Sequence, residues 1–204
     1  MIDILADKVL NGGLLTKEEA FQVAGVQRKD LFNLFSFANK IREKFRTDSV
    51  DLCAIVNAKS GACPEDCSYC AQSSKSKTGI EVYPLIRKEV VLEKAKEAKE
   101  AGVKRFCIVT SGRRIGKAEL FEIVTMVKKI RRIGLLPCAT LGLLSKGELL
   151  FLKESGLERY HHNLETSERF FPEICRTHTY NDKLKTIEAA KSAGLSVCSG
   201  GIFG

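Results

Sequence analysis

The chain has 204 residues, of which 44% are hydrophobic and 28% charged, and its formal net charge is +8 at pH 7. These fractions are typical of a soluble globular protein, and no apolar run approaches the roughly 20 residues of a membrane helix, so we expect no membrane association. The basic residues are spread along the chain and often alternate with acidic ones, a pattern that argues against nucleic-acid binding.

Residues 1–47 predict two or three short helices. Thr16 is a typical N-cap, and acidic residues occupy the first turn after it. The segment has neither the basic n-region nor the cleavage site of a secretory signal. We therefore expect a cytoplasmic protein with an N-terminal helical segment over residues 1–47.

Residues 48–204 alternate apolar runs typical of strands with amphipathic segments typical of helices. This rhythm predicts an α/β fold with a parallel sheet and crossover helices. The predicted strands lie near 50–57, 103–110, 135–141, 157–163 and 195–201, and the predicted helices near 88–101, 117–133, 145–155 and 180–193.

Three of the eight cysteines form a CxxxCxxC array, Cys63, Cys67 and Cys70, directly after the first predicted strand. Cysteine is the usual protein ligand of iron–sulfur clusters, and three thiolates leave one iron of a [4Fe-4S] cube open to a small molecule. A structural zinc site needs a fourth cysteine or histidine nearby, and the nearest histidine in sequence is His161. The array therefore indicates an iron–sulfur site.

Three further cysteines follow predicted helix ends at nearly equal distances. Cys138 and Cys198 lie four residues beyond a glycine that ends a helix, and Cys107 lies five residues beyond one. Equal distances place side chains at similar heights on parallel strands, which in a barrel form one interior layer. The three cysteines are then a ligand set, with three small buried hydrophobic side chains as the alternative.

CxxxCxxC with an aromatic residue before its last cysteine resembles the signature of the radical S-adenosylmethionine superfamily. Within it, the chain from about residue 50 to its end is similar to the biotin synthase family. The stretches that carry this resemblance are Lys59–Cys67, Tyr69–Ser74, Arg105–Cys107, Cys138–Gly142, His162–Ser167, Thr179–Tyr180 and Val197–Ile202.

The resemblance implies a (β/α)8 TIM-type barrel, of which about five βα units are present, and a homodimer for the full-length protein. It implies a [4Fe-4S] cluster, an auxiliary cluster of the [2Fe-2S] type and S-adenosylmethionine as cofactors. An electron from an external donor such as flavodoxin or ferredoxin then cleaves S-adenosylmethionine to a 5′-deoxyadenosyl radical. The implied reaction is radical insertion of sulfur into dethiobiotin, which forms biotin.

The resemblance also assigns site residues. Cys63, Cys67 and Cys70 match the ligands of the [4Fe-4S] cluster, and Cys107, Cys138 and Cys198 match those of the auxiliary cluster. The residues that match S-adenosylmethionine contacts are Tyr69 and Ile202 at the adenine, Asn163 and Glu165 at the ribose, and Lys183 at the carboxylate. Lys183 stands where some members have arginine. Lysine keeps the positive charge but cannot form the two parallel hydrogen bonds that a guanidinium group makes to a carboxylate.

Two cysteines depart from this pattern. We expect Cys53, on the first strand, to be buried, with a fourth ligand of the auxiliary cluster as the alternative. Cys175 fits no motif and is interpreted as incidental.

Two other functions are retained as alternatives, namely another radical S-adenosylmethionine enzyme with an auxiliary cluster and a metal-binding module without catalysis. Because five strands do not close an eight-stranded barrel, we expect the 204-residue chain alone to be inactive.

Overall fold

The computed structural model describes residues 1–203, which form two compact units that divide after Val50. The first unit is helical. Its elements are α1 (Ile2–Leu10), α2 (Lys17–Ala24), the 3₁₀ helix η1 (Arg28–Asp30) and α3 (Leu31–Arg46).

Thr16 begins α2 with a capping box. The Glu19 N–H donates to Thr16 Oγ1 at 3.2 Å, and the Thr16 N–H donates to Glu19 Oε2 at 2.7 Å. The same carboxylate pairs with Lys8 at 2.7 Å and thereby connects α1 to α2. The predicted N-cap at Thr16 is confirmed.

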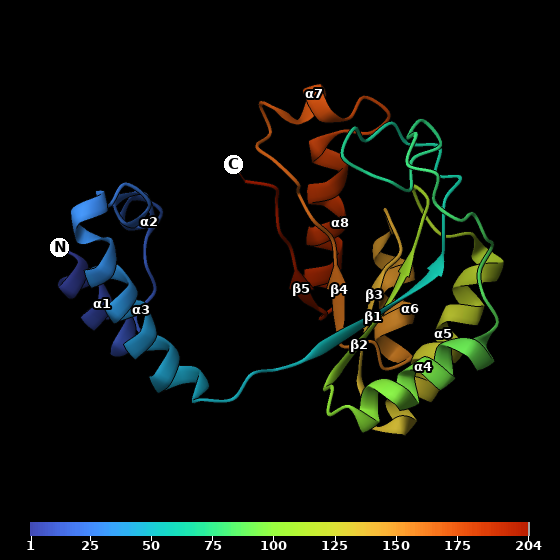
Figure 1. The fold of residues 1–204 in the computed structure, drawn as a ribbon, viewed down its shortest axis with the longest axis horizontal. Coiled ribbons are helices and arrows are strands. Elements are labelled where there is room, and N and C mark those ends of the chain that lie inside the picture. The colour runs from blue at the N-terminus through green and yellow to red at the C-terminus, as the bar shows by residue number, and fades with distance from the viewer. Residues whose placement is uncertain (204) are drawn as a thin grey trace. The chain divides into compact units, whose positions relative to one another are not determined.

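The second unit is a five-stranded parallel sheet in the order β1-β2-β3-β4-β5, which confirms the predicted α/β class (Figure 1). All five strands are shorter than the predicted ranges, and the last two have three residues each. The elements are β1 (Cys53–Lys59), α4 (Lys88–Glu100), β2 (Arg105–Thr110), α5 (Lys117–Ile133), β3 (Leu136–Thr140), α6 (Lys146–Glu154), β4 (Arg159–His161), α7 (Phe171–Ile174), α8 (Tyr180–Ser192) and β5 (Ser196–Cys198).

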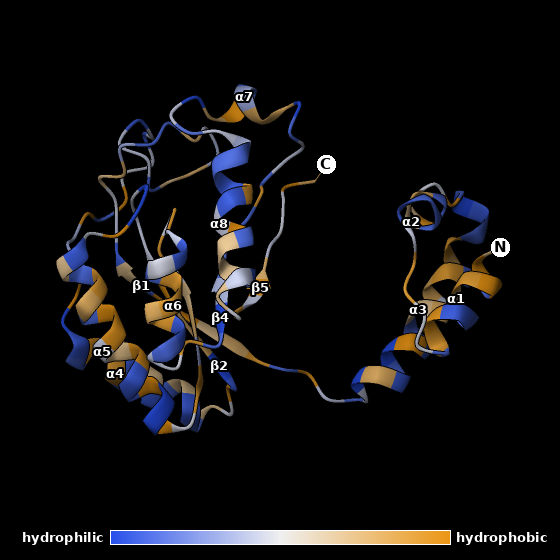
Figure 2. Ribbon diagram, turned by 180° about the vertical axis from the view of Figure 1, so that it is seen from behind, coloured by the Kyte–Doolittle hydropathy of each residue, from blue (hydrophilic) through white to orange (hydrophobic). Residues whose placement is uncertain are grey.

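The hydrophobic core lies between one face of this sheet and the helices that connect the strands. Phe106, Ile108 and Ala139 are buried in it, together with Ile123 and Val127 of α5. Hydrophobic bands alternate with polar ones along α4 and α5, as amphipathic helices require (Figure 2). Burial of each large aliphatic side chain contributes about 1.5–3 kcal/mol, so this layer holds the strands in register.

The other face of the sheet carries the alternate residues of each strand. Ile55 on this face is 63% exposed, and Cys53, two residues before it, is also exposed. The expected burial of Cys53 is therefore wrong for the described residues. The reason is that the helices cover the opposite face, while this one corresponds to a barrel interior that five strands leave open.

Candidate functional site

The cysteine array lies in the long loop between β1 and α4. Cys63 donates its N–H to Gln72 O at 3.1 Å, and Ser74 donates its N–H to Cys63 O at 2.8 Å, so the loop returns alongside its own start. Cys70 donates its N–H to Cys67 O at 3.1 Å in a tight turn. Gly61 precedes the array with φ +69°, and a Cβ there would lie 2.6 Å from Val82. This turn requires glycine.

All three cysteines of the array line one cavity of about 410 Å³ at the carboxyl end of the sheet. Polar and aromatic side chains from distant parts of the sequence also line it, among them Tyr69 in the cysteine loop, His162, Asn163 and Glu165 after β4, and Lys183 on α8.

The polar wall of this cavity is organised around Asn163. Its Oδ1 lies 3.0 Å from His161 Nε2, and its carbonyl accepts a hydrogen bond from Lys183 Nζ at 3.1 Å. Lys183 is buried and its Nζ lies 4.0 Å from the Glu165 carboxylate. Glu165 adopts φ +69°, a left-handed conformation that is unusual for a residue with a side chain. A cationic and an anionic group therefore flank the cavity side by side.

His162 is a cavity residue that sequence reasoning did not single out. Its Nε2 is buried and has no hydrogen-bond partner among the described residues. Burial, and then the positive charge of Lys183, lowers the pKa of His162 to about 3, so the ring is neutral. A neutral buried imidazole whose Nε2 has no partner suits a bound ligand that forms a hydrogen bond with this nitrogen.

Burial disfavours the thiolate form of two thiols of the array, Cys63 and Cys67. Burial, followed by the neighbouring Cys175 thiol, raises the pKa of Cys67 to about 12, and burial also raises the pKa of Cys63. Any metal that binds these thiols must displace their protons.

A second group of thiols lies on the open face of the sheet. Cys107 on β2 pairs directly with Cys138 on β3 in the parallel register, and both are buried. Cys198 lies on the same face. Cys138 is in line with Arg159 of β4, whereas Cys198 pairs with His161, two residues further along β4. The glycine offsets predict one layer of three thiols at similar height. Cys107 and Cys138 do lie at equal height, but the prediction is wrong for Cys198, which is two residues further along its strand.

Arg105 places an unpaired cationic group near Cys107 and Cys138. Arg105 precedes Cys107 by two residues, and its Nη1 is buried without a hydrogen-bond partner among the described residues. Burial, and then Cys138, raises the pKa of Cys107 to about 12. An unpaired guanidinium N–H beside two thiols fits the sulfide of an iron–sulfur cluster.

Cys175 has specific contacts, contrary to the sequence interpretation. Its Sγ lies 3.7 Å from Cys67 Sγ and 3.2 Å from His178 Nδ1. Glu65 and Asp66, inside the cysteine array, contact the same segment, Glu65 through His178 and Asp66 through Thr177. No sequence signal relates these positions, because the contact depends on the tertiary fold.

Ile202, which the resemblance placed at the adenine, is 59% exposed. It lies beside Glu165, because its N–H donates to Glu165 O at 2.6 Å. Its side chain is not among those that line the cavity.

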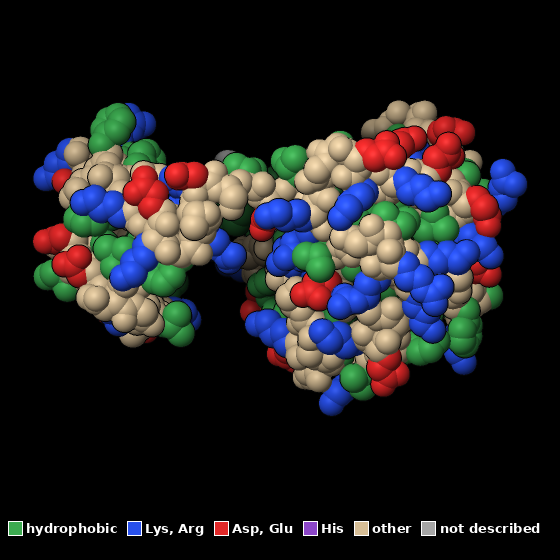
Figure 3. Space-filling view, turned by 90° about the horizontal axis from the view of Figure 1, so that it is seen from below, with side chains coloured by type: hydrophobic (Ala, Val, Ile, Leu, Met, Phe, Trp, Pro, Cys, Tyr) green, Lys and Arg blue, Asp and Glu red, His purple; other side chains and the backbone are tan. Residues whose placement is uncertain are grey.

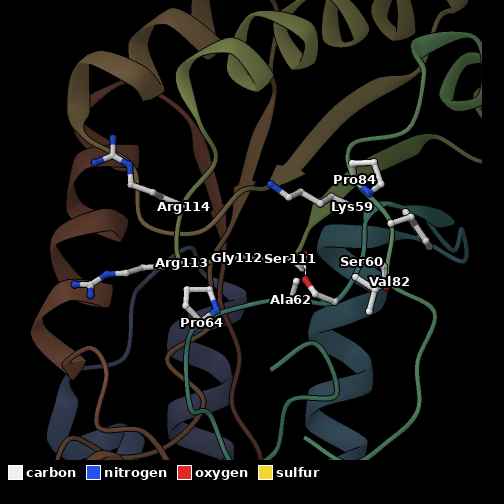
Figure 4. A pocket seen from close by; sticks show the side chains of 12 residues that line it. Lys59, Ser60, Ala62, Pro64, Val82, Pro84, Ser111, Gly112, Arg113 and Arg114 are labelled. Atoms are coloured by element: carbon white, nitrogen blue, oxygen red, sulfur yellow. Dashed lines mark hydrogen bonds between the residues drawn. The ribbon is translucent and has the colours of Figure 1, made fainter. Parts of the chain in front are cut away.

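A second cavity of about 540 Å³ lies at the base of the cysteine loop (Figure 4). Its cations already have partners: Lys59 pairs with Glu119 at 2.7 Å and Arg114 with Glu148 at 2.6 Å. Arg113 points away from the loop and donates to Thr177 O at 3.1 Å. We assign no ligand to this cavity.

The surface of the chain mixes both signs of charge. In Figure 3, basic side chains are spread over the visible face with acidic ones among them. In the described part of the chain, every helix is too short or too polar to span a bilayer.

The sequence profile of the radical SAM superfamily matches residues 58–204. The chain belongs to this superfamily. Its cofactors are accordingly an iron–sulfur cluster and S-adenosylmethionine, and the cavity lined by Cys63, Cys67 and Cys70 offers the three thiols that such a cluster needs.

Among curated relatives, the radical SAM chain is 54% identical over 174 residues to the biotin synthase of Thermodesulfovibrio yellowstonii, covering 85% of this chain and 55% of the relative. It is 44% identical over 205 residues to that of Citrifermentans bemidjiense, covering 100% of this chain and 62% of the relative. The chain therefore spans little more than half the length of these relatives.

Two solved structures show the same fold. The chain superposes on HydG, a maturase of the [FeFe]-hydrogenase, with a TM-score of 0.84 at 22% identity, covering 100% of this chain and 46% of HydG. Methylornithine synthase gives a TM-score of 0.78 at 23% identity, covering 97% of this chain and 58% of that chain. These neighbours confirm the predicted barrel class, of which the described residues form five strands.

Proposed function

We propose that this chain is the cofactor-binding part of a biotin synthase, which inserts sulfur into dethiobiotin to form biotin. The observation that carries the proposal is the second thiol group, Cys107, Cys138 and Cys198, on the same sheet face as the array's cavity, in a chain 54% identical to a biotin synthase. A radical SAM enzyme needs only the first three cysteines to cleave its cofactor. A separate thiol set agrees with a reaction that consumes sulfur.

In this proposal Cys63, Cys67 and Cys70 hold a [4Fe-4S] cluster, and Cys107, Cys138 and Cys198 hold an auxiliary [2Fe-2S] cluster. When bound, the first cluster supplies the electron that cleaves S-adenosylmethionine, and the second supplies sulfur. The electron comes from a protein donor such as flavodoxin or ferredoxin. The full-length protein is a cytoplasmic homodimer.

The polar wall of the cavity orients S-adenosylmethionine. Lys183 offers its ammonium group to the carboxylate, while Glu165, 4.0 Å from it, accepts hydrogen bonds from the ribose hydroxyls. Asn163 Oδ1 lies 3.0 Å from His161 Nε2, and we assign its amide N–H₂ group as a donor to the ligand. Tyr69 covers the adenine, and Ile202 adds apolar contact at the rim.

A chimera tests the proposal. The matched 174 residues replace their counterparts in the biotin synthase of Thermodesulfovibrio yellowstonii, and the gene is expressed in a biotin auxotroph that lacks its own synthase. We expect growth without biotin, and none from the chimera with Cys138→Ala. A folded chimera that binds both clusters but does not support growth contradicts the function and leaves the superfamily assignment intact.

A further inference from the structure

Cys67 and Cys175 face each other from two loops that lie 108 positions apart in the sequence, with their Sγ atoms separated by 3.7 Å. Backbone groups on both sides hold the pair in place. The residue after Cys67 donates its N–H to Ile174 O at 2.9 Å, and Asp66, before it, accepts from the Arg176 N–H at 2.9 Å. The two sulfurs are therefore brought together by the way in which the loops are joined, and not only by the rotation of two side chains.

The neighbours of Cys175 leave its own proton available for Cys67. His178 Nδ1 lies 3.2 Å from Cys175 Sγ and also contacts Glu65 Oε2. Because a carboxylate can only accept, Nδ1 carries a proton, and it cannot take a second one from the thiol. Two other acceptors lie within reach of the S–H of Cys175, namely Cys67 Sγ at 3.7 Å and Thr177 Oγ1 at 3.6 Å.

An iron–sulfur cluster in the array decides between these two acceptors. Cys67 loses its proton when it ligates iron, and an anionic sulfur accepts a hydrogen bond more strongly than a neutral hydroxyl does. The Thr177 oxygen also already accepts from the Asp66 N–H at 3.2 Å. Cys175 is buried, so bulk water does not compete for its proton. The geometry therefore favours donation to Cys67.

We propose that Cys175 is a positioning residue of the [4Fe-4S] site, whose S–H donates a hydrogen bond to Cys67 Sγ and thereby raises the reduction potential of the cluster. The reduced cluster carries one more negative charge than the oxidised one, and part of that charge lies on the ligand sulfurs. A donor at one of these sulfurs therefore stabilises the reduced form more. The inference rests on the superfamily assignment and does not depend on the substrate.

A redox titration of the reconstituted chain tests this hydrogen bond. The reduced cluster is followed by electron paramagnetic resonance in the parent, in Cys175→Ala and in Cys175→Ser. At the parent's midpoint potential, the ratio of reduced to oxidised cluster should be roughly threefold to tenfold lower in Cys175→Ala, where tenfold corresponds to about 59 mV for one electron. Cys175→Ser keeps a donor and should recover part of this loss.

The direction of the shift separates a lost hydrogen bond from a loosened site. Water that enters a loosened site stabilises the more highly charged reduced cluster, so loosening should raise the potential, whereas loss of the donor should lower it. A raised or unchanged potential in Cys175→Ala overturns the proposal. Ser68→Ala is the matched control, because it removes an exposed hydroxyl from the residue next to Cys67, and it should titrate like the parent.

Exchange of the thiol proton provides a measurement on the parent chain itself. Electron–nuclear double resonance of the reduced cluster, recorded in H₂O and in D₂O, detects exchangeable protons close to the cluster. We expect an exchangeable coupling in the parent that Cys175→Ala lacks. A parent whose spectra show no exchangeable coupling refutes donation by Cys175, even where a variant fails to fold.

Discussion

The Glu65 carboxylate contacts the imidazole of His178, although the two residues lie 113 positions apart in the sequence. Its neighbour Asp66 accepts hydrogen bonds from the backbone N–H groups of Arg176 at 2.9 Å and Thr177 at 3.2 Å. Glu65 and Asp66, which lie between the first two cysteines of the array, thus connect the segment after α7 to the cysteine loop through hydrogen bonds.

Loss of the Asp66 carboxylate should release this segment. The Arg176 N–H, followed by the Thr177 hydroxyl, lowers the pKa of Asp66 to about 2, so the contact persists down to strongly acidic pH. In Asp66→Ala we expect the amides of residues 176 and 177 to exchange roughly tenfold faster with deuterium, measured by mass spectrometry. Asp48→Ala, in the helical unit, is the control and should leave this exchange unchanged.

The first cluster depends on the array. Cys63→Ala, Cys67→Ala or Cys70→Ala should each lower the iron bound after anaerobic reconstitution by about four atoms per chain, because the cube loses a ligand. Iron and sulfide assays with visible absorbance measure this. Retention of the cluster in all three variants contradicts the assigned ligands.

The thiols on the strands should behave independently of the array. Cys107→Ala and Cys138→Ala are expected to spare the first cluster's absorbance, because they arise from β2 and β3 rather than from the cysteine loop. In the chimera they should abolish biotin formation. Normal biotin production by either variant would mean that these cysteines are ordinary core residues.

Tyr160 holds the loop after β3. Its hydroxyl donates to Gly142 O and accepts from the Leu141 N–H at 3.3 Å, and the side chain is fully buried. Tyr160→Phe leaves both backbone groups unpaired and should lower the free energy of unfolding by about 1–3 kcal/mol. Urea denaturation measures it. Tyr83→Phe removes an exposed hydroxyl contact and should cost clearly less.

His162 should make the fold sensitive to acid. Its pKa is lowered from 6.5 to about 3, so below pH 6.5 the unfolded chain binds a proton that the folded chain does not. The free energy of unfolding is therefore highest above pH 6.5 and falls toward pH 3, by about 1.4 kcal/mol per pH unit. Urea denaturation at pH 7, 6, 5 and 4 should show a shallower loss for His162→Gln. An identical slope in that variant would contradict the buried neutral ring.

The sequence predicts the parts of this site that depend on local spacing. The spacing of the cysteines in the CxxxCxxC array is enough to indicate an iron–sulfur site. The alternation of strand and helix patterns also correctly predicts the strands that carry Cys107 and Cys138. The exposure of Cys53 was not predictable, because it depends on what covers the inner face rather than on strand periodicity.

The contact of Cys175 with Cys67 lay beyond sequence reasoning for a different reason. It is made between two loops, each without regular periodicity, and the acidic residues that join them could equally be solvated charges. Only the packing of the segment after α7 against the cysteine loop reveals the partners.

The register of β4 has a consequence for the distance between the two groups of thiols. Arg159 is in line with Cys138, whereas His161, two residues later, lines the cavity of the array and pairs with Cys198. Each such step along a strand is about 6.6 Å. Strand length therefore sets the distance between the cavity of the array and the thiols of Cys107 and Cys138. Two residues inserted in β2 between Cys107 and Thr110 would lengthen that distance without altering a single ligand.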